Sequence, residues 1–353
     1  MGTGLTDELR ARAAALLDPV VRDYYNGGSG DGQSAAEAAQ AWRSYRLRPH
    51  VLRDVATVDT RTTVAGLELG LPVLAAPTAL QGLAHAAAER ATAQGCAAAG
   101  TIPVVSTRAS LPLEQMGLAP GRWWMQLYVL QDRRTTHDLA LRARDLGAAA
   151  LVVTVDTPVV ASRAGGRAAL PREVLRVAPG IPPADSADGL GAGEQAMDVS
   201  VVDLSLLAEL TGLPVWAKGV LRGDDAARLV AAGVAGLIVS NHGGRQLDGA
   251  IATAHALPEV VDAVAGRVPV LVDGGVRNGR DVLTALTLGA SAVLIGRPVL
   301  WGLTVGGAAG VAAVFDDLRR DLEEQFRLCG VTSVADLRRD LLVEPTRPSP
   351  TPG

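Results

Sequence analysis

Cysteine is scarce in this 353-residue chain, and an excess of positive charge is absent. Only Cys96 and Cys329 occur, and their spacing matches neither a metal site nor a redox motif, so we expect two packing residues rather than a disulfide. The net charge of −4 argues against a basic nucleic-acid surface. We therefore expect no nucleic-acid partner.

Lysine is almost missing as well. Lys218 is the only lysine among 33 lysine and arginine residues. Lysine is a compact point charge whereas arginine is a planar fork, so a site that needs the former does not accept the latter. Lys218 is therefore a candidate functional residue, with chance retention as the alternative.

Long hydrophobic runs are also missing. We find no uninterrupted apolar stretch of the roughly 20 residues that a membrane helix requires. Charged residues at positions 7, 8, 10 and 12 leave no signal-peptide core near the N-terminus. Four histidines have no metal-ligand spacing: His50, His85, His137 and His255. These features predict a cytoplasmic protein without a membrane partner and without a bound metal.

A regular alternation of short apolar runs and amphipathic stretches starts after residue 60. Eight runs are predicted as strands: Val73–Ala76, Pro103–Val105, Trp123–Leu127, Leu151–Val155, Val215–Ala217, Gly236–Val239, Val270–Val272 and Ala292–Ile295. Continuous apolar strands separated by helices indicate a parallel sheet covered on both faces. Eight such units predict an α/β fold, a closed (β/α)8 TIM barrel. A doubly wound sheet is the alternative, but no Gly-rich phosphate turn follows the first run.

The rest of the chain is assigned around this single barrel domain of residues 1–343. Residues 1–60 are predicted as a helical extension, with helices over Leu5–Tyr25 and Ala35–Leu47. Seven strands are followed by helical patterns, for example His85–Ala99, Thr135–Leu146, Gly223–Ala232 and Gly279–Leu288. Residues 164–199, after the fourth strand, are too long for a plain barrel loop and are predicted as a mobile lid. The proline-rich residues 344–353 are predicted as a disordered tail.

The run Ser240–Gln246 carries the strongest chemical signal. His242 and Arg245 are separated by two glycines, directly after the predicted strand Gly236–Val239. A base and a fixed cation at a strand end are suited to taking a proton from an anionic substrate. The spacing alone also allows a hydrolase, an isomerase or a chance loop.

Polar residues and glycines close nearly every predicted strand. Because the working residues of TIM barrels gather at the C-terminal ends of the strands, these residues form one polar ring. After the last two strands, Asp273–Arg277 and Gly296-Arg297 combine glycines with guanidinium groups, which suits a phosphate.

A phosphate site near a lone lysine and a histidine suggests a phosphorylated redox cofactor, and FMN fits best. Lys218 can stand at the N1/C2=O edge of the flavin ring, where a cation favours the anionic reduced form. Ser106, Gln126 and Thr154 can hydrogen-bond the polar edge of the ring. A barrel that binds a phosphorylated ligand without redox chemistry is the alternative.

At this point the chain resembles the FMN-dependent 2-hydroxy acid oxidases and dehydrogenases, a family that includes glycolate oxidase and lactate oxidase. The matching motifs are Asp23-Tyr24-Tyr25, Ala76-Pro77-Thr78-Ala79, Gln126-Leu127-Tyr128, Thr154–Pro158, Ser240–Gln246, Asp273–Arg277 and Gly296-Arg297. They cover almost the whole chain. Within the family the chain looks most like the bacterial 4-hydroxymandelate oxidases, which act in arylglycine and antibiotic biosynthesis.

The resemblance implies a role for each matching residue. His242 is expected to take a proton from the substrate, Asp156 to orient it, and Tyr128 to bind the 2-hydroxyl or developing oxo group. The substrate carboxylate is assigned to Tyr24, Arg163 and Arg245. The flavin is assigned to Pro77, Thr78, Ala79, Ser106, Gln126, Thr154, Lys218, Asp273, Gly274, Gly275, Arg277, Gly296 and Arg297.

Two positions depart from the family pattern. Arg108 stands where glycolate-type members commonly carry tryptophan, which would open the side-chain end of the pocket and adds Arg108 to the expected substrate contacts. The usual Gly-Arg-Arg after the fourth strand is Ala161-Ser162-Arg163, so one arginine is kept.

The sequence therefore predicts FMN-dependent oxidation of an aromatic (S)-2-hydroxy acid, mandelate or 4-hydroxymandelate, to the 2-keto acid. Oxygen is expected to become hydrogen peroxide, and the resemblance implies a homotetramer. Two alternatives stay open: a small aliphatic substrate such as lactate or glycolate, and a dehydrogenase that passes electrons to a quinone or carrier protein. Proton abstraction is compatible with both hydride transfer and carbanion formation, and both stay open.

Overall fold

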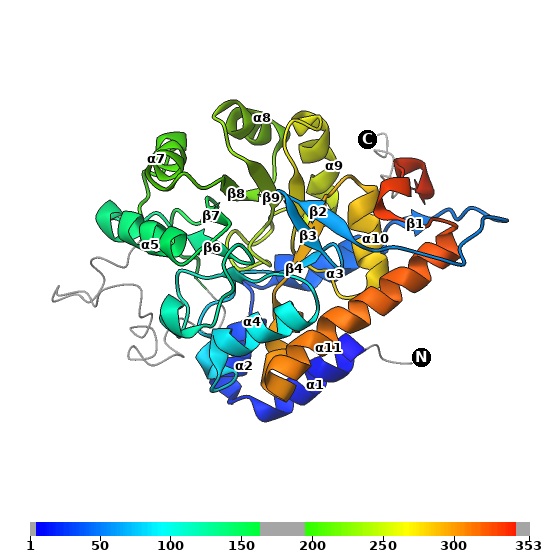
Figure 1. The fold of residues 1–353 in the computed structure, drawn as a ribbon, viewed down its shortest axis with the longest axis horizontal. Helices are drawn as coiled ribbons and strands as arrows, with labels where there is room; N and C mark the ends of the chain where they lie inside the picture. Colours follow the sequence, from blue (N-terminus) through cyan, green and yellow to red (C-terminus); the bar gives the residue numbers. More distant parts are fainter. Residues whose placement is uncertain (1–4, 163–194, 344–353) are drawn as a thin grey trace, which may run out of the picture.

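The computed structural model describes residues 5–162 and 195–343, and a central barrel of eight parallel strands organises them (Figure 1). In chain order these are β4 (Val73–Ala75), β5 (Val104–Val105), β6 (Trp124–Leu127), β7 (Ala150–Thr154), β8 (Val215–Val220), β9 (Gly236–Val239), β10 (Val270–Val272) and β11 (Ala292–Ile295). Each strand pairs with its sequence neighbour, and β11 pairs with β4. A parallel bridge between Ala75 and Pro103 joins the ends of this order and closes the barrel. The predicted TIM barrel is confirmed, and the doubly wound alternative is wrong.

Helices cover the outside of the barrel between successive strands. They are α4 (Ala88–Ala98), α5 (Arg133–Asp145), α7 (Val201–Thr211), α8 (Gly223–Ala231), α9 (Thr253–Val264), α10 (Gly279–Thr287) and α11 (Arg297–Cys329). After β5 only the short 3-10 turn η2 (Leu113–Gln115) is present, so seven of the eight strands are followed by an α-helix, as predicted. Further 3-10 turns are η1 (Gln81–Leu83), η4 (Val334–Asp336) and η5 (Arg339–Leu341).

The inside of the barrel is filled by apolar side chains, which is why its strands are continuous hydrophobic runs. Trp124 and Trp216 are fully buried there, with ring centroids 4.9 Å apart. A hairpin of β2 (Thr62–Val64) and β3 (Leu67–Leu69) adds Val64 and Leu69 to this cluster. Arg122, just before β6, donates to the backbone oxygen of Glu68 over 2.7 Å, which places the hairpin at the N-terminal end of the barrel. That end is therefore closed, and the opposite end is left for chemistry.

The N-terminal extension differs from the prediction of one long helix over Leu5–Tyr25. It forms α1 (Leu5–Leu16) and α2 (Pro19–Asn26), because Asp18 caps the second helix with a 2.8 Å bond to the backbone N–H of Val20, and Pro19 follows in the first turn.

The second predicted helix, Ala35–Leu47, is also shorter than expected. It spans α3 (Gln33–Arg43), and the last residues instead form the short strand β1 (Arg46–Leu47), which pairs antiparallel with β12 (Leu342–Val343). The local pattern is compatible with a helix, and pairing with a segment almost 300 residues away decides the outcome.

The expectation of no sufficiently long apolar stretch is corrected at α11. This helix is long and apolar enough to cross a membrane by length and composition, and more than half of its most apolar window is buried. It bends at Gly306 and Gly307, whose backbone angles are not helical, and it packs against α1, α4 and α10 (Figure 1). Its apolar composition is accounted for by this packing.

Several predictions concern residues outside the described part of the chain: most of the 164–199 lid, Arg163 and the 344–353 tail. The final five residues of the predicted lid are described. Leu130 and Gln195 form an antiparallel bridge, and the N–H of Ala196 donates to the oxygen of Val129 over 2.8 Å. Residues 195–199 are therefore docked against the loop that follows β6.

Candidate active site

His242 and Asp156 form a pair at the C-terminal end of the barrel. His242 follows β9 and Asp156 follows β7, and Nδ1 of His242 lies 3.0 Å from Oδ1 of Asp156. A carboxylate at Nδ1 keeps a proton on that atom, which leaves Nε2 as the basic nitrogen. The backbone of His242 has φ of 57°, a left-handed conformation that is rare outside glycine, and strain of this kind is common at functional sites.

Asp156 is held as an anion by its surroundings. Burial alone would raise its pKa, but His242, Lys218 and the Thr157 hydroxyl outweigh burial, so the pKa lies below the ordinary value. The hydroxyl of Thr157 donates to Oδ1 over 3.0 Å, and Gln246 donates to the backbone oxygen of Asp156 over 3.1 Å. The geometry suits a carboxylate that orients an imidazole and stabilises its protonated form.

The lone lysine is buried in the same ring. Lys218 is 4% exposed, and its Nζ lies 2.9 Å from Oδ2 of Asp273 and 2.8 Å from Oγ of Ser240. Burial lowers the pKa of Lys218, but Asp273 and Asp156 more than compensate, so its pKa is raised and the side chain stays charged. Because Ser240 Oγ also accepts the N–H of His242 over 3.0 Å, one hydroxyl connects the lysine to the histidine loop.

A second polar chain crosses the ends of β5, β6 and β7. The side-chain nitrogen of Gln126 donates to the hydroxyl of Thr154 over 3.0 Å, and its oxygen accepts the N–H of Thr107 over 3.1 Å. Ser106 accepts the N–H of Arg108 over 3.1 Å. The three residues predicted at the flavin ring, Ser106, Gln126 and Thr154, are thus all buried on adjacent strands. Thr107 was missed by the sequence reasoning, although it directly follows Ser106.

The predicted phosphate residues lie after β10 and β11. At Gly275, φ is 81° and an added Cβ would lie 2.1 Å from the oxygen of Ala38, so only glycine fits between this turn and α3. The guanidinium of Arg277 packs 5.4 Å from the ring centroid of Trp301, and burial lowers the pKa of Arg277 to about 10. Gly296 caps α11, and Arg297 begins that helix.

The two arginines Arg245 and Arg297 meet at the C-terminal end of α2. Nη1 of Arg245 donates to the oxygens of Tyr24, Tyr25 and Gly27 over 2.8, 3.2 and 3.0 Å. Arg297 donates to the oxygens of Tyr25 and Gly27 over 3.2 and 3.1 Å. The carbonyl end of a helix attracts cations, so α2 fixes both side chains. The Arg245 guanidinium also lies 5.3 Å from the ring centroid of Tyr24, which brings two of the predicted carboxylate ligands together.

Tyr128 lies directly after β6, and its loop is fixed from several sides. Its N–H donates to the hydroxyl of Thr107 over 3.2 Å. The ring of Tyr128 faces the guanidinium of Arg108, 5.9 Å from the ring centroid. Burial raises the pKa of the Tyr128 hydroxyl, which keeps it protonated and able to donate a hydrogen bond. Arg108 and Tyr128 therefore share one side of the site.

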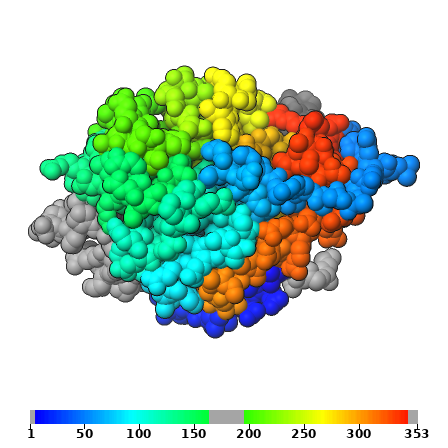
Figure 2. Space-filling view, in the orientation of Figure 1, coloured from blue at the N-terminus to red at the C-terminus, as the bar shows by residue number. Residues whose placement is uncertain are grey.

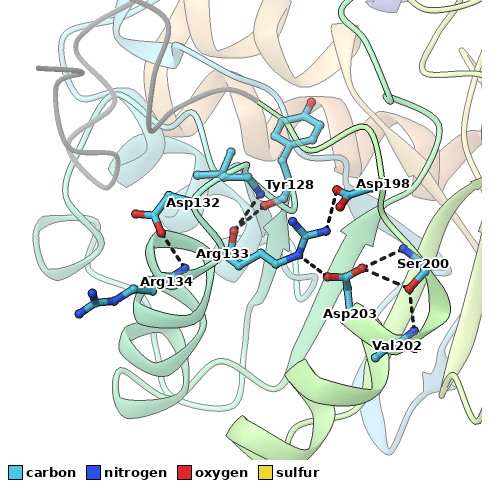
Figure 3. Close-up of polar contacts among 10 residues, drawn as sticks. Tyr128, Asp132, Arg133, Arg134, Asp198, Ser200, Val202 and Asp203 are labelled. Atoms are coloured by element: carbon cyan, nitrogen blue, oxygen red, sulfur yellow. Dashed lines mark hydrogen bonds and ion pairs between the residues drawn. The ribbon is translucent and has the colours of Figure 1, made fainter. Parts of the chain in front are cut away.

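Arg133, at the start of α5, ties the end of the Tyr128 loop to the docked residues 195–199, and the sequence reasoning missed it. Its guanidinium bridges Asp198 and Asp203, each over 2.8 Å (Figure 3). Asp203 also accepts the N–H of Ser200 over 2.8 Å in the capping box of α7. Arg133 thus joins the start of α5 to the start of α7, beside Tyr128.

The segment Pro77–Ala79 follows β4, and Gln81 connects it to a buried carboxylate, Glu89, that also escaped prediction. Gln81 donates to the Thr78 hydroxyl over 3.0 Å, and Glu89 accepts the N–H groups of Gln81 and Ser110 over 3.3 and 2.9 Å. Nothing in the spacing of Glu89, 4% exposed inside α4, distinguishes it from a surface residue in the sequence.

These residues fit FMN by an observation independent of any relative. Oδ1 of Asp273 and Oδ1 of Asn241 are buried and have no hydrogen-bond partner among the described residues. Buried polar atoms are normally satisfied, and the hydroxyl groups of a ribityl chain are donors of the required kind. The charged Lys218 lies beside Asp273, and the glycine turn follows it. Together these residues fit the ribityl chain and phosphate of FMN.

Comparisons with known proteins place the chain among its relatives. Residues 13–344 match the family model of the FMN-dependent dehydrogenases. The L-lactate oxidase of Nostoc sp. is 42% identical, with 95% of this chain and 96% of the relative covered. The 2-hydroxyacid oxidase 1 of Mus musculus is 40% identical, with 93% of each covered. A solved structure of mandelate oxidase with (S)-4-hydroxymandelic acid is 36% identical and superposes with a TM-score of 0.84 over 96% of this chain and 98% of that one.

The family model covers nearly the whole barrel, and the relatives match from end to end. The prediction of FMN as the cofactor is confirmed, and a barrel without redox chemistry is excluded. The chain belongs to the FMN-dependent dehydrogenase family and is an FMN-dependent 2-hydroxy acid oxidase.

Proposed function

We propose that the enzyme oxidises an aromatic (S)-2-hydroxy acid of the mandelate or 4-hydroxymandelate type to the 2-keto acid. The substrate loses one hydrogen from C2 and one from its hydroxyl, and oxygen gains both to become hydrogen peroxide. FMN, when bound, supplies the acceptor for the two electrons that leave C2.

The chain's own residues account for the proton and for substrate orientation. Nε2 of His242 takes the proton, and the anionic Asp156 at Nδ1 stabilises the resulting imidazolium. Arg245 and Tyr24 hold the carboxylate, with Arg163 assigned to the same task by resemblance. The protonated hydroxyl of Tyr128 binds the substrate oxygen.

Pro77–Ala79, Ser106, Gln126, Thr154 and Lys218 are assigned to the flavin ring. The ribityl phosphate is assigned to Asp273–Arg277 and Gly296-Arg297. Among the residues assigned to the flavin ring, Lys218 supplies the only positive charge, and it is buried.

The observation that carries the aromatic side chain is the likeness to mandelate oxidase over nearly the whole fold. Arg108 supports it. A guanidinium beside the Tyr128 ring replaces a bulky indole, and a cation of this kind binds aromatic faces and phenol oxygens. By the same resemblance, we propose a place in arylglycine and antibiotic biosynthesis, with 4-hydroxymandelate as the substrate.

A small aliphatic substrate is the second candidate, since a relative named L-lactate oxidase is 42% identical. The two candidates separate in a panel of (S)-mandelate, (R)-mandelate, 4-hydroxymandelate, lactate and glycolate, with peroxide release measured for the wild type and for Arg108→Trp. The aromatic proposal predicts the highest kcat/KM with the (S)-aryl acids and a selective loss of these in the variant. Highest kcat/KM with lactate or glycolate would overturn it.

Oxygen as the acceptor has its own test. Reduced enzyme mixed with oxygen in a stopped-flow instrument should reoxidise within the turnover time and release one peroxide per substrate. Reoxidation slower than turnover with a quinone would favour the dehydrogenase alternative.

We also propose a homo-oligomer, a tetramer by resemblance, in the cytoplasm. The loop between β1 and β2 projects from the molecule (Figures 1 and 2), and Leu52 on it is fully exposed with a strained φ of 56°. A second copy of the chain is the partner we favour for Leu52. Exposed apolar side chains also occur on α7, at Val202 and Leu206, and these would offer further contacts between copies. Light scattering of Leu52→Asp against the wild type tests the oligomeric state.

The cytoplasmic location is tested by cell fractionation. The free thiols of Cys96 and Cys329 fit a reducing compartment of this kind.

A further inference from the structure

Asp248 lies on the His242 loop, yet its carboxylate caps a helix from the other end of the chain. Oδ2 accepts the backbone N–H groups of Asp31, Gly32 and Gln33 over 2.9, 3.0 and 3.4 Å. Oδ1 accepts the N–H of Ser34 over 2.9 Å. These four donors are 214 to 217 residues away in sequence.

The capped helix has no cap of its own. At α3 the N-cap position is Gly32, which has no side chain and makes no capping bond. The first N–H groups of a helix have no partner within it, and an anion at this end is stabilised by the helix dipole. Asp248 therefore does for α3 what a local serine or aspartate does for most helices, but from across the site.

The turn is shaped to receive this carboxylate. Gly30 has φ of 50°, and an added Cβ would lie 2.9 Å from Cβ of Asp248. Close by, the N–H of Ser29 donates to the oxygen of Gly244 over 2.9 Å, and the hydroxyl of Ser34 donates to the oxygen of Ala250 over 3.2 Å. The turn 28–34 and the loop 240–250 thus form one packed unit.

This unit contains or directly adjoins two of the predicted carboxylate ligands. Arg245 belongs to the loop and Tyr24 to α2, immediately before the turn. The three bonds from Nη1 of Arg245 to the end of α2 are the contact that aligns the two side chains. If the turn shifts, α2 shifts with it, and Arg245 loses its alignment with Tyr24.

We infer that Asp248 is a positioning residue for substrate binding: by capping α3 from the His242 loop, it sets Arg245 against Tyr24 for the substrate carboxylate. This inference rests on the proposed role of those two residues. The N–H donors, with Ser34 foremost, also hold the pKa of Asp248 below its ordinary value, so the cap is charged at neutral pH.

The test compares Asp248→Ala, Asp248→Asn and a matched control, Asp31→Asn. Asp31 is an exposed carboxylate in the same turn, so its variant makes the same charge change without removing the cap. Benzoate and benzamide serve as probes, titrated into each FMN-loaded variant by the change in flavin absorption, with melting temperatures measured in parallel. No turnover is needed, so the result does not depend on which hydroxy acid is the substrate.

Misplacing a binding group by about 1 Å can cost as much as 100-fold, and we expect Asp248→Ala to weaken benzoate roughly tenfold and benzamide by less than about twofold. The asparagine keeps one acceptor oxygen and should fall between alanine and wild type. Asp31→Asn should match the wild type. Equal loss of both probes, or unchanged benzoate binding in Asp248→Ala, would overturn the inference and leave Asp248 as a stabilising cap only. If wild-type benzoate binding does not depend on Arg245 either, tested with Arg245→Met, the failure lies in the proposed function.

Discussion

Nδ1 of His242 and Oδ1 of Asp156 lie 3.0 Å apart, although the two residues follow different strands and are 86 positions apart in the sequence. The pair gives the barrel a base whose orientation and tautomer are set by a partly buried carboxylate. The anionic state of Asp156 depends in turn on His242 and Lys218.

Asp156→Asn tests the carboxylate's part in this pair. An amide supplies no negative charge for the imidazolium, so we expect flavin reduction to slow by about 10²–10⁴-fold, the range of a lost acid–base function. FMN should stay bound. Thr157→Val is the matched control, since it removes only the 3.0 Å hydroxyl bond to Asp156 and should slow reduction far less. Rapid anaerobic mixing measures both rates, and comparable losses would contradict the assignment.

Lys218→Arg tests the argument from the lone lysine. The lysine is enclosed between Asp273 and Ser240, and a planar guanidinium does not fit the two contacts of 2.9 and 2.8 Å. We expect the dissociation constant for FMN to rise by about tenfold or more, because a buried charge pair is disturbed. Recovery of flavin fluorescence on dilution measures it. A silent substitution would mean that chance retained this lysine.

Arg133→Ala tests the tether beside Tyr128. Loss of the bonds to Asp198 and Asp203 should lower the free energy of unfolding by about 1 kcal/mol, since the pairs are partly exposed. Flavin reduction should also slow because the Tyr128 loop loses a neighbour. The neighbouring Arg134 is exposed, and Arg134→Ala serves as the control in urea unfolding and in reduction rates. Identical behaviour of the two variants would exclude a role for the tether.

Asp281→Asn tests a buried carboxyl next to the predicted phosphate turn. Burial raises the pKa of Asp281 from 3.8 to about 6, so in the folded state ionisation is unfavourable. The stability that the protonated group contributes is complete below pH 3.8 and is lost as pH rises through about 6. At 1.36 kcal/mol per pKa unit, the wild type loses about 3 kcal/mol of its free energy of unfolding over this range. The asparagine variant has no group that ionises here, so it does not lose this stability. Urea unfolding at pH 4.5 and 7 should show the variant gaining on the wild type with pH; parallel curves would contradict this.

Much of the fold follows from local sequence. Continuous apolar runs predicted all eight strands to within two or three residues, because strands buried on both faces leave little ambiguity. The break at Leu17 and Asp18 was visible as a capping signal, Asp18 followed by Pro19, but was masked by the apolar spacing across it. The β1–β12 pairing was not predictable, since each strand has two residues and the partner decides the conformation.

The site residues were predicted from motifs at strand ends, whereas their supports were not. Arg133 and Asp248 act through contacts to residues 70 and 217 positions away, and one sequence contains no record of such contacts. Glu89 acts over shorter separations, 8 to 21 positions, but through backbone N–H groups of turns whose course the sequence does not show. Charged residues in helices and turns are usually solvated, so their spacing carries no signal. The supports become visible only once the barrel brings the loops together.

The most direct test is the anaerobic reduction of bound FMN by (S)-mandelate in the wild type and in His242→Ala. The loss of the flavin absorption band gives the rate of reduction. We predict rapid bleaching in the wild type and a rate lower by about 10²–10⁴-fold in the variant, which keeps its FMN. Bleaching of the variant at the wild-type rate would show that His242 is not the base and would contradict the central claim.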